Sequence, residues 1–214
     1  MTTTITGLPA TLWRGYRQRE YAEAFVYAGQ IRMSSLESFR EIEDETRRDV
    51  SEGVARLRVP GDVPVITLDR ESGEVRGEAT RPGLFNFSAP ILQAAYFLCL
   101  STTRAGAAKF GDTIVEVVHT QRLIDAVEAA VRSQRPALEV AFVEGFPVRY
   151  DKDGMAPAPA LPERMRLTYG QKPALFSDDA EYRIAVVLTG LAADAQRYLD
   201  LTLPGVAGVV RIVS

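Results

Sequence analysis

One stretch of the chain restricts the possible folds more than any other, because residues 95–100 are apolar throughout. A strand that is buried on both faces of a sheet has this pattern. Residues 113–118 are rich in β-branched side chains, which favour strands, and residues 181–188 form a further strand-like run. We therefore expect a β-sheet in which residues 95–100 and 113–118 are the central strands.

Strands and helices alternate in the first quarter of the chain. Residues 11–16 are rich in aromatic side chains and predict a strand, and residues 30–35 alternate polar and apolar side chains like a second one. Between them, residues 19–28 carry apolar side chains at helical spacing, with Gly29 where a C-terminal helix cap belongs. Apolar side chains every three positions in residues 36–42 predict another helical turn.

Turn-forming residues divide the middle of the chain. Pro60-Gly61 separates two strand-like runs, residues 54–59 and 63–69, and residues 71–76 turn into a third. This order predicts an antiparallel meander. Residues 151–162 contain a glycine and three prolines, which indicates a surface loop.

A long helix is predicted in the second half of the chain. It begins at Gln121, has Thr120 as its N-cap, carries one apolar stripe and is stopped by Pro136. Residues 163–169 predict a short helix, and residues 209–213 predict a closing strand. With a strand-rich middle between segments that also contain helices, the chain is expected to have an α+β fold.

Length and composition indicate one domain that spans residues 1–214, because a chain of this size can bury a sizeable core. The chain has 46% hydrophobic and 25% charged residues, as in ordinary globular proteins. We expect a cytoplasmic protein without membrane attachment, since the first residues lack a signal peptide pattern and no apolar run approaches the length of a bilayer span. Cys99 is the single cysteine, so no intramolecular disulfide can form, as suits a reducing compartment.

Charge and motif content exclude several common functions. The net charge of −3 gives no overall attraction to a phosphate backbone, and one histidine with one cysteine cannot supply a usual zinc ligand set. The glycine-rich phosphate loop and the serine elbow of hydrolases are both absent from the sequence. Carboxylates are dense in residues 41–52, but their mixture with arginines is typical of a solvated helix face.

Three short motifs far apart in the chain remain as candidates for chemistry. Arg14 precedes Gly15 in the opening strand, Ser34-Ser35 ends the next strand, and Glu181 begins a late strand. Their order resembles the arginine, serine and glutamate signature of the ADP-ribosyltransferase superfamily. The resemblance implies a mixed, mostly antiparallel split β-sheet with peripheral helices around a cleft for NAD.

The chain also resembles a little-characterised bacterial family with a Ser-Ser-x-x-x-Phe segment, a Cys-x-Ser strand and a Glu-x-Arg strand. The matching segments here are residues 34–39, Cys99-Leu100-Ser101 and Glu181-Tyr182-Arg183. The order of the three segments carries this resemblance, since each one is short.

The resemblance implies a role for each candidate residue. Glu181 would stabilise the oxocarbenium-like cation that forms when the nicotinamide–ribose bond breaks, and Arg14 would bind the dinucleotide phosphates. Gly15 would let the backbone approach the ligand, and Asp179 would select or deprotonate the acceptor. Ser34 or Ser35 would orient the ribose. The side chain that stacks on the nicotinamide would be Tyr16, Tyr21 or Phe39.

The expected function is therefore that of an NAD-consuming ADP-ribosyltransferase or NAD glycohydrolase whose acceptor is a protein, a nucleic acid or water. Such small bacterial enzymes resemble toxins or phage-conflict proteins, which implies an antitoxin partner. Two alternatives stay open: a non-catalytic nucleotide- or protein-binding domain on the same scaffold, and a metal-dependent nuclease that uses residues 41–52. Each candidate also has a structural interpretation: Arg14 pairs with a carboxylate, Ser34 or Ser35 caps a helix, and Glu181 pairs with Arg183.

Overall fold

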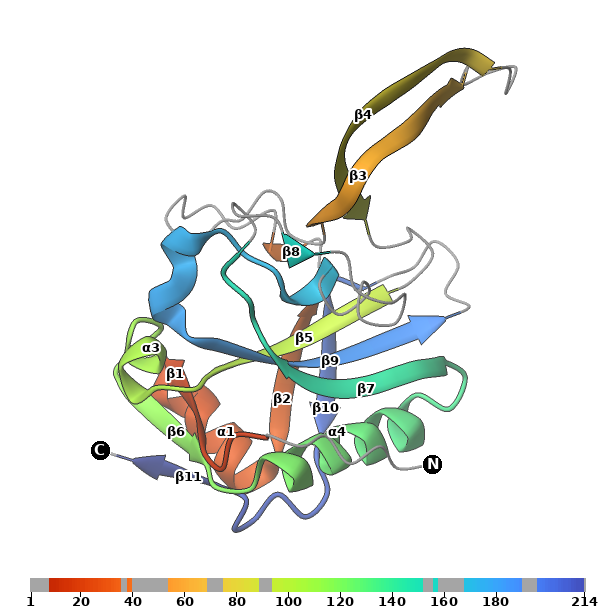
Figure 1. Cartoon of the computed structure of the whole chain (residues 1–214). Coiled ribbons are helices and arrows are strands. Elements are labelled where there is room, and N and C mark those ends of the chain that lie inside the picture. The colour runs from red at the N-terminus through yellow and green to blue at the C-terminus, as the bar shows by residue number, and fades with distance from the viewer. Residues whose placement is uncertain are drawn as a thin grey trace.

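The computed structural model describes most of the chain and shows an α+β fold around a mostly antiparallel sheet (Figure 1). The described residues are 8–35, 38–39, 54–68, 75–88, 94–151, 156–157, 168–189 and 196–213. Among the helices that these residues form, none has the length and apolar character needed to cross a bilayer.

Eight strands form the main sheet, and every pair of them is antiparallel. Six strands follow one path across the sheet: β10 (Tyr198–Thr202), β2 (Gln30–Ser35), β5 (Ala94–Ser101), β1 (Leu12–Tyr16), β6 (Thr113–Val117) and β11 (Val210–Val213). The other two are β9 (Glu181–Thr189), which pairs with β5, and β7 (Glu139–Pro147), which pairs with β9. The predicted strands at residues 11–16, 30–35, 95–100, 113–118, 181–188 and 209–213 are thereby confirmed. β5 is central as predicted, but the prediction that residues 113–118 form a central strand was wrong, because β6 lies next to the edge strand β11.

The sheet divides along one edge of β5. β9 pairs with β5 over its whole length, so β1 and β2 must share the opposite edge. β2 pairs there through Ser34 opposite Phe97, and β1 pairs through Trp13 opposite Ser101. The two strands therefore diverge from β5 between these points, and the sheet has a fork.

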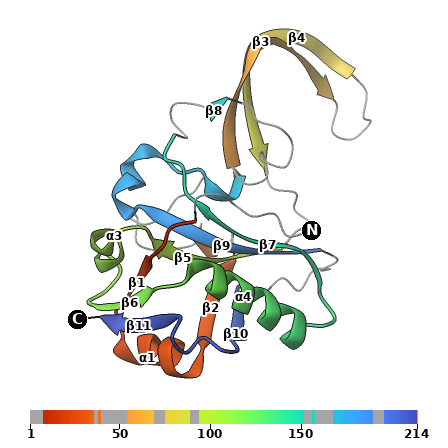
Figure 2. The same ribbon diagram turned by 60° about the horizontal axis from the view of Figure 1, so that its bottom comes forward.

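The main core lies between the sheet and two helices, α1 (Arg19–Ala28) and α4 (Thr120–Gln134). Figures 1 and 2 show both helices on the same side of the sheet. The alternation of side chains along a strand sends every second residue of β5 and β9 into this core, which includes Leu98, Leu100, Ile184 and Val186. A smaller core covers the other face, with Phe97 and Ala185 among its members.

Both predicted long helices are confirmed, but the N-cap of the second differs from the prediction. Gly29 ends α1 in the left-handed conformation with a φ of 66°, as expected for a glycine C-cap. In α4 the N-cap is His119, which makes no side-chain cap, so the assignment of this role to Thr120 was wrong. The Thr120 hydroxyl instead donates to the carbonyl of Pro9 over 2.7 Å and ties the N-terminal segment to the helix.

A second, three-stranded sheet carries a long hairpin that projects from the body of the molecule (Figures 1 and 2). It consists of β3 (Val54–Leu68), β4 (Val75–Ser88) and β8 (Ala156–Pro157). The predicted turn at Pro60-Gly61 was wrong, because β3 continues through it. At Pro60-Gly61 its pairing with β4 shows a register shift, between Arg58 and Asp62, as at a β-bulge that accommodates a proline, and a second shift lies between Thr67 and Leu68.

Several predicted segments lie wholly or mainly outside the described residues: the helical turn at 36–42, the turn at 71–73, the charged run at 41–52, most of the loop at 151–162 and most of the helix at 163–169. Five elements of the described residues were not predicted: α3 (Arg104–Ala108), β7, β8, β10 and the 3₁₀ helix η1 (Ala174–Asp179). Of these, α3 and η1 border the fork in the sheet and shape the site described next.

Candidate functional site

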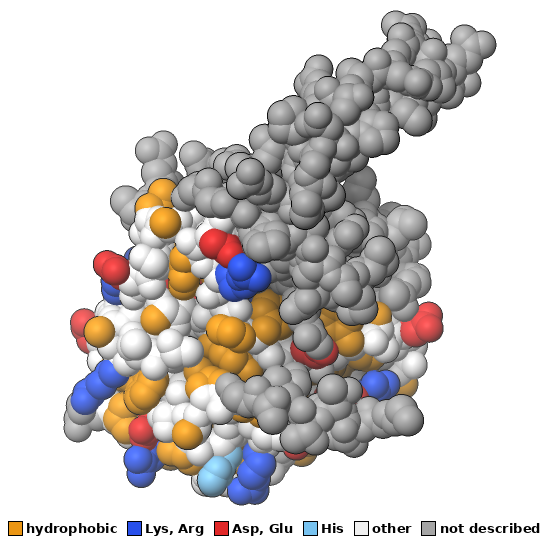
Figure 3. Space-filling view, in the orientation of Figure 1, with side chains coloured by type: hydrophobic (Ala, Val, Ile, Leu, Met, Phe, Trp, Pro, Cys, Tyr) orange, Lys and Arg blue, Asp and Glu red, His pale blue; other side chains and the backbone are white. Residues whose placement is uncertain are grey.

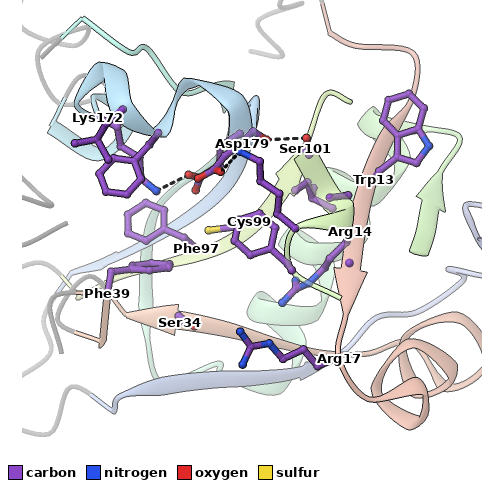
Figure 4. Close-up of a pocket in the computed structure, with 18 residues that line it drawn as sticks. Trp13, Arg14, Arg17, Ser34, Phe39, Phe97, Cys99, Ser101, Lys172 and Asp179 are labelled. Carbon is purple, nitrogen blue, oxygen red and sulfur yellow. Dashed lines mark hydrogen bonds and ion pairs between the residues drawn. The ribbon is translucent and has the colours of Figure 1, made fainter. Parts of the chain in front are cut away.

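A cavity of about 590 Å³ opens at the fork between β1, β2 and β5 (Figure 4). Its volume is in the range typical of small-molecule sites. The residues that line it come from six parts of the chain: Trp13, Arg14, Gly15, Arg17, Ser34, Phe39, Phe97, Cys99, Leu100, Ser101, Ala107, Lys109, Phe110, Lys172, Leu175, Phe176, Asp179 and Glu181. Six of the eight residues predicted for the site are therefore together at one cavity.

Arg14 reaches into this cavity from β1 (Figure 4). Its Nη1 atom is buried and has no hydrogen-bond partner among the described residues, which is costly for a charged donor. Tyr16 is not one of the lining residues; its ring lies 5.1 Å from the guanidinium carbon of Arg14 and supports it. Burial raises the pKa of Tyr16, and the charge of Arg14 opposes that rise only in part.

Gly15 lines the cavity, as predicted. The structure gives a reason for a glycine here other than the expected approach of the backbone to a ligand. A Cβ atom there would lie 2.0 Å from the carbonyl oxygen of Ala107 in α3. The glycine therefore allows α3 to pack against β1, which closes one end of the cavity.

The two predicted serines have different positions. Ser34 lines the cavity, whereas Ser35 does not: its hydroxyl accepts from the backbone N–H of Ser38 over 3.3 Å, as in a helix cap. Phe39 lines the cavity near Phe97, with ring centroids 6.1 Å apart. Tyr21 is 60% exposed on α1 and is not part of the cavity wall, so its suggested stacking role is not supported.

Glu181 lies at the floor of the cavity between two cations. Its Oε1 atom is 2.7 Å from Nε of Arg183, and its Oε2 atom is 2.7 Å from Nζ of Lys172. The side chains of all three residues are at least nine-tenths buried. The predicted structural pairing of Glu181 with Arg183 is therefore present.

The charge of this cluster keeps Glu181 ionised. Burial alone would raise the pKa of its carboxyl group, but the charges of Arg183 and Lys172 and their hydrogen bonds outweigh that effect. The pKa of Glu181 consequently lies far below its ordinary value. The carboxylate can accept further hydrogen bonds, because its two oxygens have about four lone-pair sites.

The backbone that leads into Glu181 is held from β5 and α3. The hydroxyl of Ser101 donates to the carbonyl of Asp179 over 2.8 Å, and the backbone N–H of Thr102 donates to the carbonyl of Ala180 over 2.8 Å. Ala180 has a φ of 45°, in the left-handed region that non-glycine residues rarely adopt. Gly106 allows the close approach, since a Cβ there would lie 2.4 Å from the Asp179 carbonyl.

Asp179 lines the cavity, as predicted, and pairs with a lysine that was not predicted. Its Oδ1 atom is 3.3 Å from Nζ of Lys109, which follows α3. The Asp179 side chain is 17% exposed, so solvent or a ligand can reach it.

Cys99 also lines the cavity, although its apolar run suggested a buried structural role. Burial raises the pKa of its thiol, and the nearby charge of Glu181 raises it further. The thiol is therefore protonated at neutral pH and a poor nucleophile.

Some of the residues missed by the sequence analysis had a usable signal and others did not. Arg183 follows the predicted Glu181 by two positions on a strand, so the two side chains lie on the same face of the sheet. The same alternation of side chains places Phe97 on the face of β5 that carries Cys99. Lys172 and Lys109 lie outside regular strands, and nothing in their spacing indicated the site.

Positive charge prevails in the cavity. Four cations and two carboxylates line it, although the whole chain has a net charge of −3. Figure 4 shows Arg14 and Arg17 on one side and Lys172 on another. On the molecular face in Figure 3, by contrast, positive and negative side chains of the described residues are interspersed around apolar ones. The charges of the described lining residues therefore favour an anionic ligand over a cationic one.

Comparisons with protein-family models, curated proteins and solved structures found no match to this chain.

Proposed function

We propose that this chain cleaves the nicotinamide–ribose bond of NAD in the cavity at the fork, as an ADP-ribosyltransferase or an NAD glycohydrolase. One observation carries the proposal: Arg14, Ser34 and Glu181, from three separate strands, line one cavity. The fork in the sheet supports a fold like that of the ADP-ribosyltransferases, in which a split sheet forms the NAD cleft.

The unsatisfied nitrogen of Arg14 supports binding of an anionic ligand. A buried guanidinium N–H without a partner is rare in folded proteins, because its desolvation is not compensated. A phosphate oxygen would supply the missing acceptor with a charge-assisted hydrogen bond. Arg17 lines the same side of the cavity and adds positive charge for a second phosphate.

The ionised state of Glu181 supports the bond-breaking step. When the bond from the ribose C1 atom to nicotinamide breaks, the bonding electrons leave with neutral nicotinamide and the ribose becomes an oxocarbenium-like cation. A fixed carboxylate nearby stabilises this cation. An acceptor nucleophile, or water, then attacks C1 and loses a proton, for which Asp179 is the nearest further carboxylate that lines the cavity.

A non-catalytic binding domain on the same scaffold is the second candidate, and one observation favours it. Both oxygens of Glu181 are already bonded to cations, so a ligand must share or displace one of these contacts. NAD binding without release of nicotinamide would support this candidate. The carboxylates of the third candidate, a metal-dependent nuclease, are at residues 41–52, which lie outside the described residues.

The resemblance to small bacterial toxins and phage-conflict proteins extends the proposal to a biological setting. An NAD-consuming enzyme of this kind would act inside the producing cell and would need an antitoxin partner. Its acceptor would be a protein, a nucleic acid or water.

The test is the release of nicotinamide from NAD by the purified protein, with and without a cell lysate as a source of acceptors. Glu181→Gln should lower turnover by about 10²- to 10³-fold, because one electrostatic contact to the transition state is lost. Arg14→Gln should raise KM by about tenfold or more, since it removes a charged hydrogen bond.

The matched control is Glu128→Gln, which removes a carboxylate from an exposed pair with Arg132 on α4. It should release nicotinamide at the wild-type rate. Circular dichroism must show that each variant is folded, and calorimetry with NAD distinguishes lost binding from lost turnover. Absence of release by a folded wild type that binds NAD would favour the binding domain over the enzyme.

A further inference from the structure

Arg183 makes a set of contacts that exceeds what an ion pair with Glu181 requires. Its side chain is fully buried, and it follows Glu181 by two positions on β9. Its guanidinium carbon lies 5.4 Å from the ring centre of Phe39 and 5.3 Å from that of Phe97. Its Nη1 atom donates to the carbonyl of Tyr169 over 2.6 Å. Contacts with Phe39, Phe97 and Tyr169 therefore help to fix the orientation of the guanidinium, in addition to the pair with Glu181.

The two cations beside Glu181 differ in their access to the cavity. Lys172 is one of the described residues that line the cavity, and Arg183 is not. Arg183 bonds to Oε1 of Glu181, and Lys172 bonds to Oε2. Oε1 is thus held by a residue outside the described cavity wall, and Oε2 contacts a residue of that wall.

We propose that Arg183 is a positioning residue, which holds Oε1 of Glu181 and thereby presents Oε2 to the ligand. The proposal rests on the function proposed above. The planar guanidinium suits this role because it bonds to the carboxylate and the Tyr169 carbonyl at once, in a fixed geometry. A lysine offers a flexible point charge in place of that fork.

Other groups that face Glu181 must be considered when charge is removed. The titratable or charged side chains that interact with it electrostatically or lie beside it are Cys99 from β5, Tyr150 after β7, Lys172, Asp179 from η1 and Arg183. Lys172 and Arg183 carry positive charge that favours the ionised carboxylate. Replacing Arg183 with a neutral residue therefore makes protonation of Glu181 easier.

Two substitutions separate geometry from charge. Arg183→Lys keeps the positive charge and loses the fork, and Arg183→Met loses both. Arg32→Lys is the matched control, because Arg32 forms an exposed, two-bonded pair with Asp200 and is not among the described residues that line the cavity. The measurement is kcat, KM and the pH profile of kcat for nicotinamide release.

Arg183→Lys should lower kcat by about 10- to 100-fold with KM nearly unchanged, since small displacements of a reacting group are costly. Its profile should keep the acid limb of the wild type. Arg183→Met should lower kcat at least as much and also shift the acid limb to higher pH. Arg32→Lys should match the wild type in all three quantities.

Wild-type kcat in Arg183→Lys would overturn the proposal. A kcat that is lowered without any pH shift in Arg183→Met would also overturn it, since a smaller folded fraction scales the rate at every pH alike. An Arg183→Lys protein that does not fold, beside a folded Arg32→Lys, would make Arg183 a structural residue and reject the positioning role. Absence of release by the wild type is a separate result, which refutes the proposed function and this inference with it.

Discussion

Replacement of Glu181 with glutamine should destabilise the fold strongly, because this carboxylate balances two buried cations. The cluster has one negative and two positive charges, and its side chains are 0–10% exposed. In the variant, Arg183 and Lys172 contact a neutral amide in place of the carboxylate. The NH₂ group of that amide then faces one of the two cationic donors, with which it cannot form a hydrogen bond. Breaking a buried ion pair by removing one partner costs about 3–5 kcal/mol of the free energy of unfolding, and we expect a value in this range.

Lys172→Met should have a much smaller effect. The change leaves the Glu181 carboxylate paired with the guanidinium of Arg183. Methionine keeps an unbranched apolar side chain, which can pack against the Phe176 ring that now lies 5.3 Å from Nζ of Lys172. We expect the free energy of unfolding to change by about 1 kcal/mol or less, as for buried ion pairs that are replaced by apolar side chains.

In a Glu181→Gln protein, the further change Lys172→Met should raise the free energy of unfolding. In the Glu181→Gln background, Lys172→Met removes one of the two cations that contacted the lost carboxylate, and the amide oxygen of the glutamine can still accept from Arg183. The double variant should therefore be more stable than Glu181→Gln alone, with a coupling energy of about 1–3 kcal/mol.

Urea denaturation at pH 7, followed by far-ultraviolet circular dichroism, measures all four proteins of this cycle. A parallel cycle on the exposed pair of Glu128 and Arg132 should give a coupling of about 0.3–0.5 kcal/mol. Additive effects at Glu181 and Lys172, or equal costs for the two single variants, would show that charge balance does not govern the stability of the cluster.

Three further outcomes follow from the structure. The pKa of Glu181 in the folded protein lies below the unfolded value of about 4.3. The carboxylate therefore stabilises the fold above that pH, and this stabilisation is lost as the pH falls. Between about pH 5 and pH 3, the urea midpoint should fall less steeply for Glu181→Gln than for the wild type. Gly15→Ala should lower the free energy of unfolding by about 1–3 kcal/mol through its clash with Ala107, as thermal denaturation can measure. Cys99 should react with a thiol reagent at pH 8 about tenfold or more slowly than in urea, because burial raises its pKa; equal rates would contradict the raised pKa.

The strands were predictable where the alternation of side chains was regular. β5 and β9 have long apolar runs, and their centres matched the prediction to within one or two residues. β7 was missed although it pairs along β9, because a register shift between Val140 and Phe142 interrupts its period of two. β10 was missed because it has five residues, of which only Leu199 and Leu201 turn inward.

The candidate site was predictable from the residues that strands place, and not from those that irregular segments place. Arg14, Ser34 and Glu181 lie on strands, and pairing through β5 brings them to one cavity. Lys172 reaches Glu181 because its segment is held to the chain after β7, with the Lys172 N–H bonded to the carbonyl of Arg149 over 2.8 Å. Such a bridge between irregular segments has no sequence period, so no pattern could reveal it.

Lys172 is also the member of the charge cluster that supplies a cation to the cavity wall. Its Nζ atom lies 2.7 Å from Oε2 of Glu181, and its side chain is 10% exposed. A cation in this position attracts an anionic ligand to the cavity. Arg14, with its buried and unsatisfied Nη1, lies across the cavity from Lys172 (Figure 4). From these positions the two cations can contact different parts of one anionic ligand, with the carboxylate of Glu181 beside it.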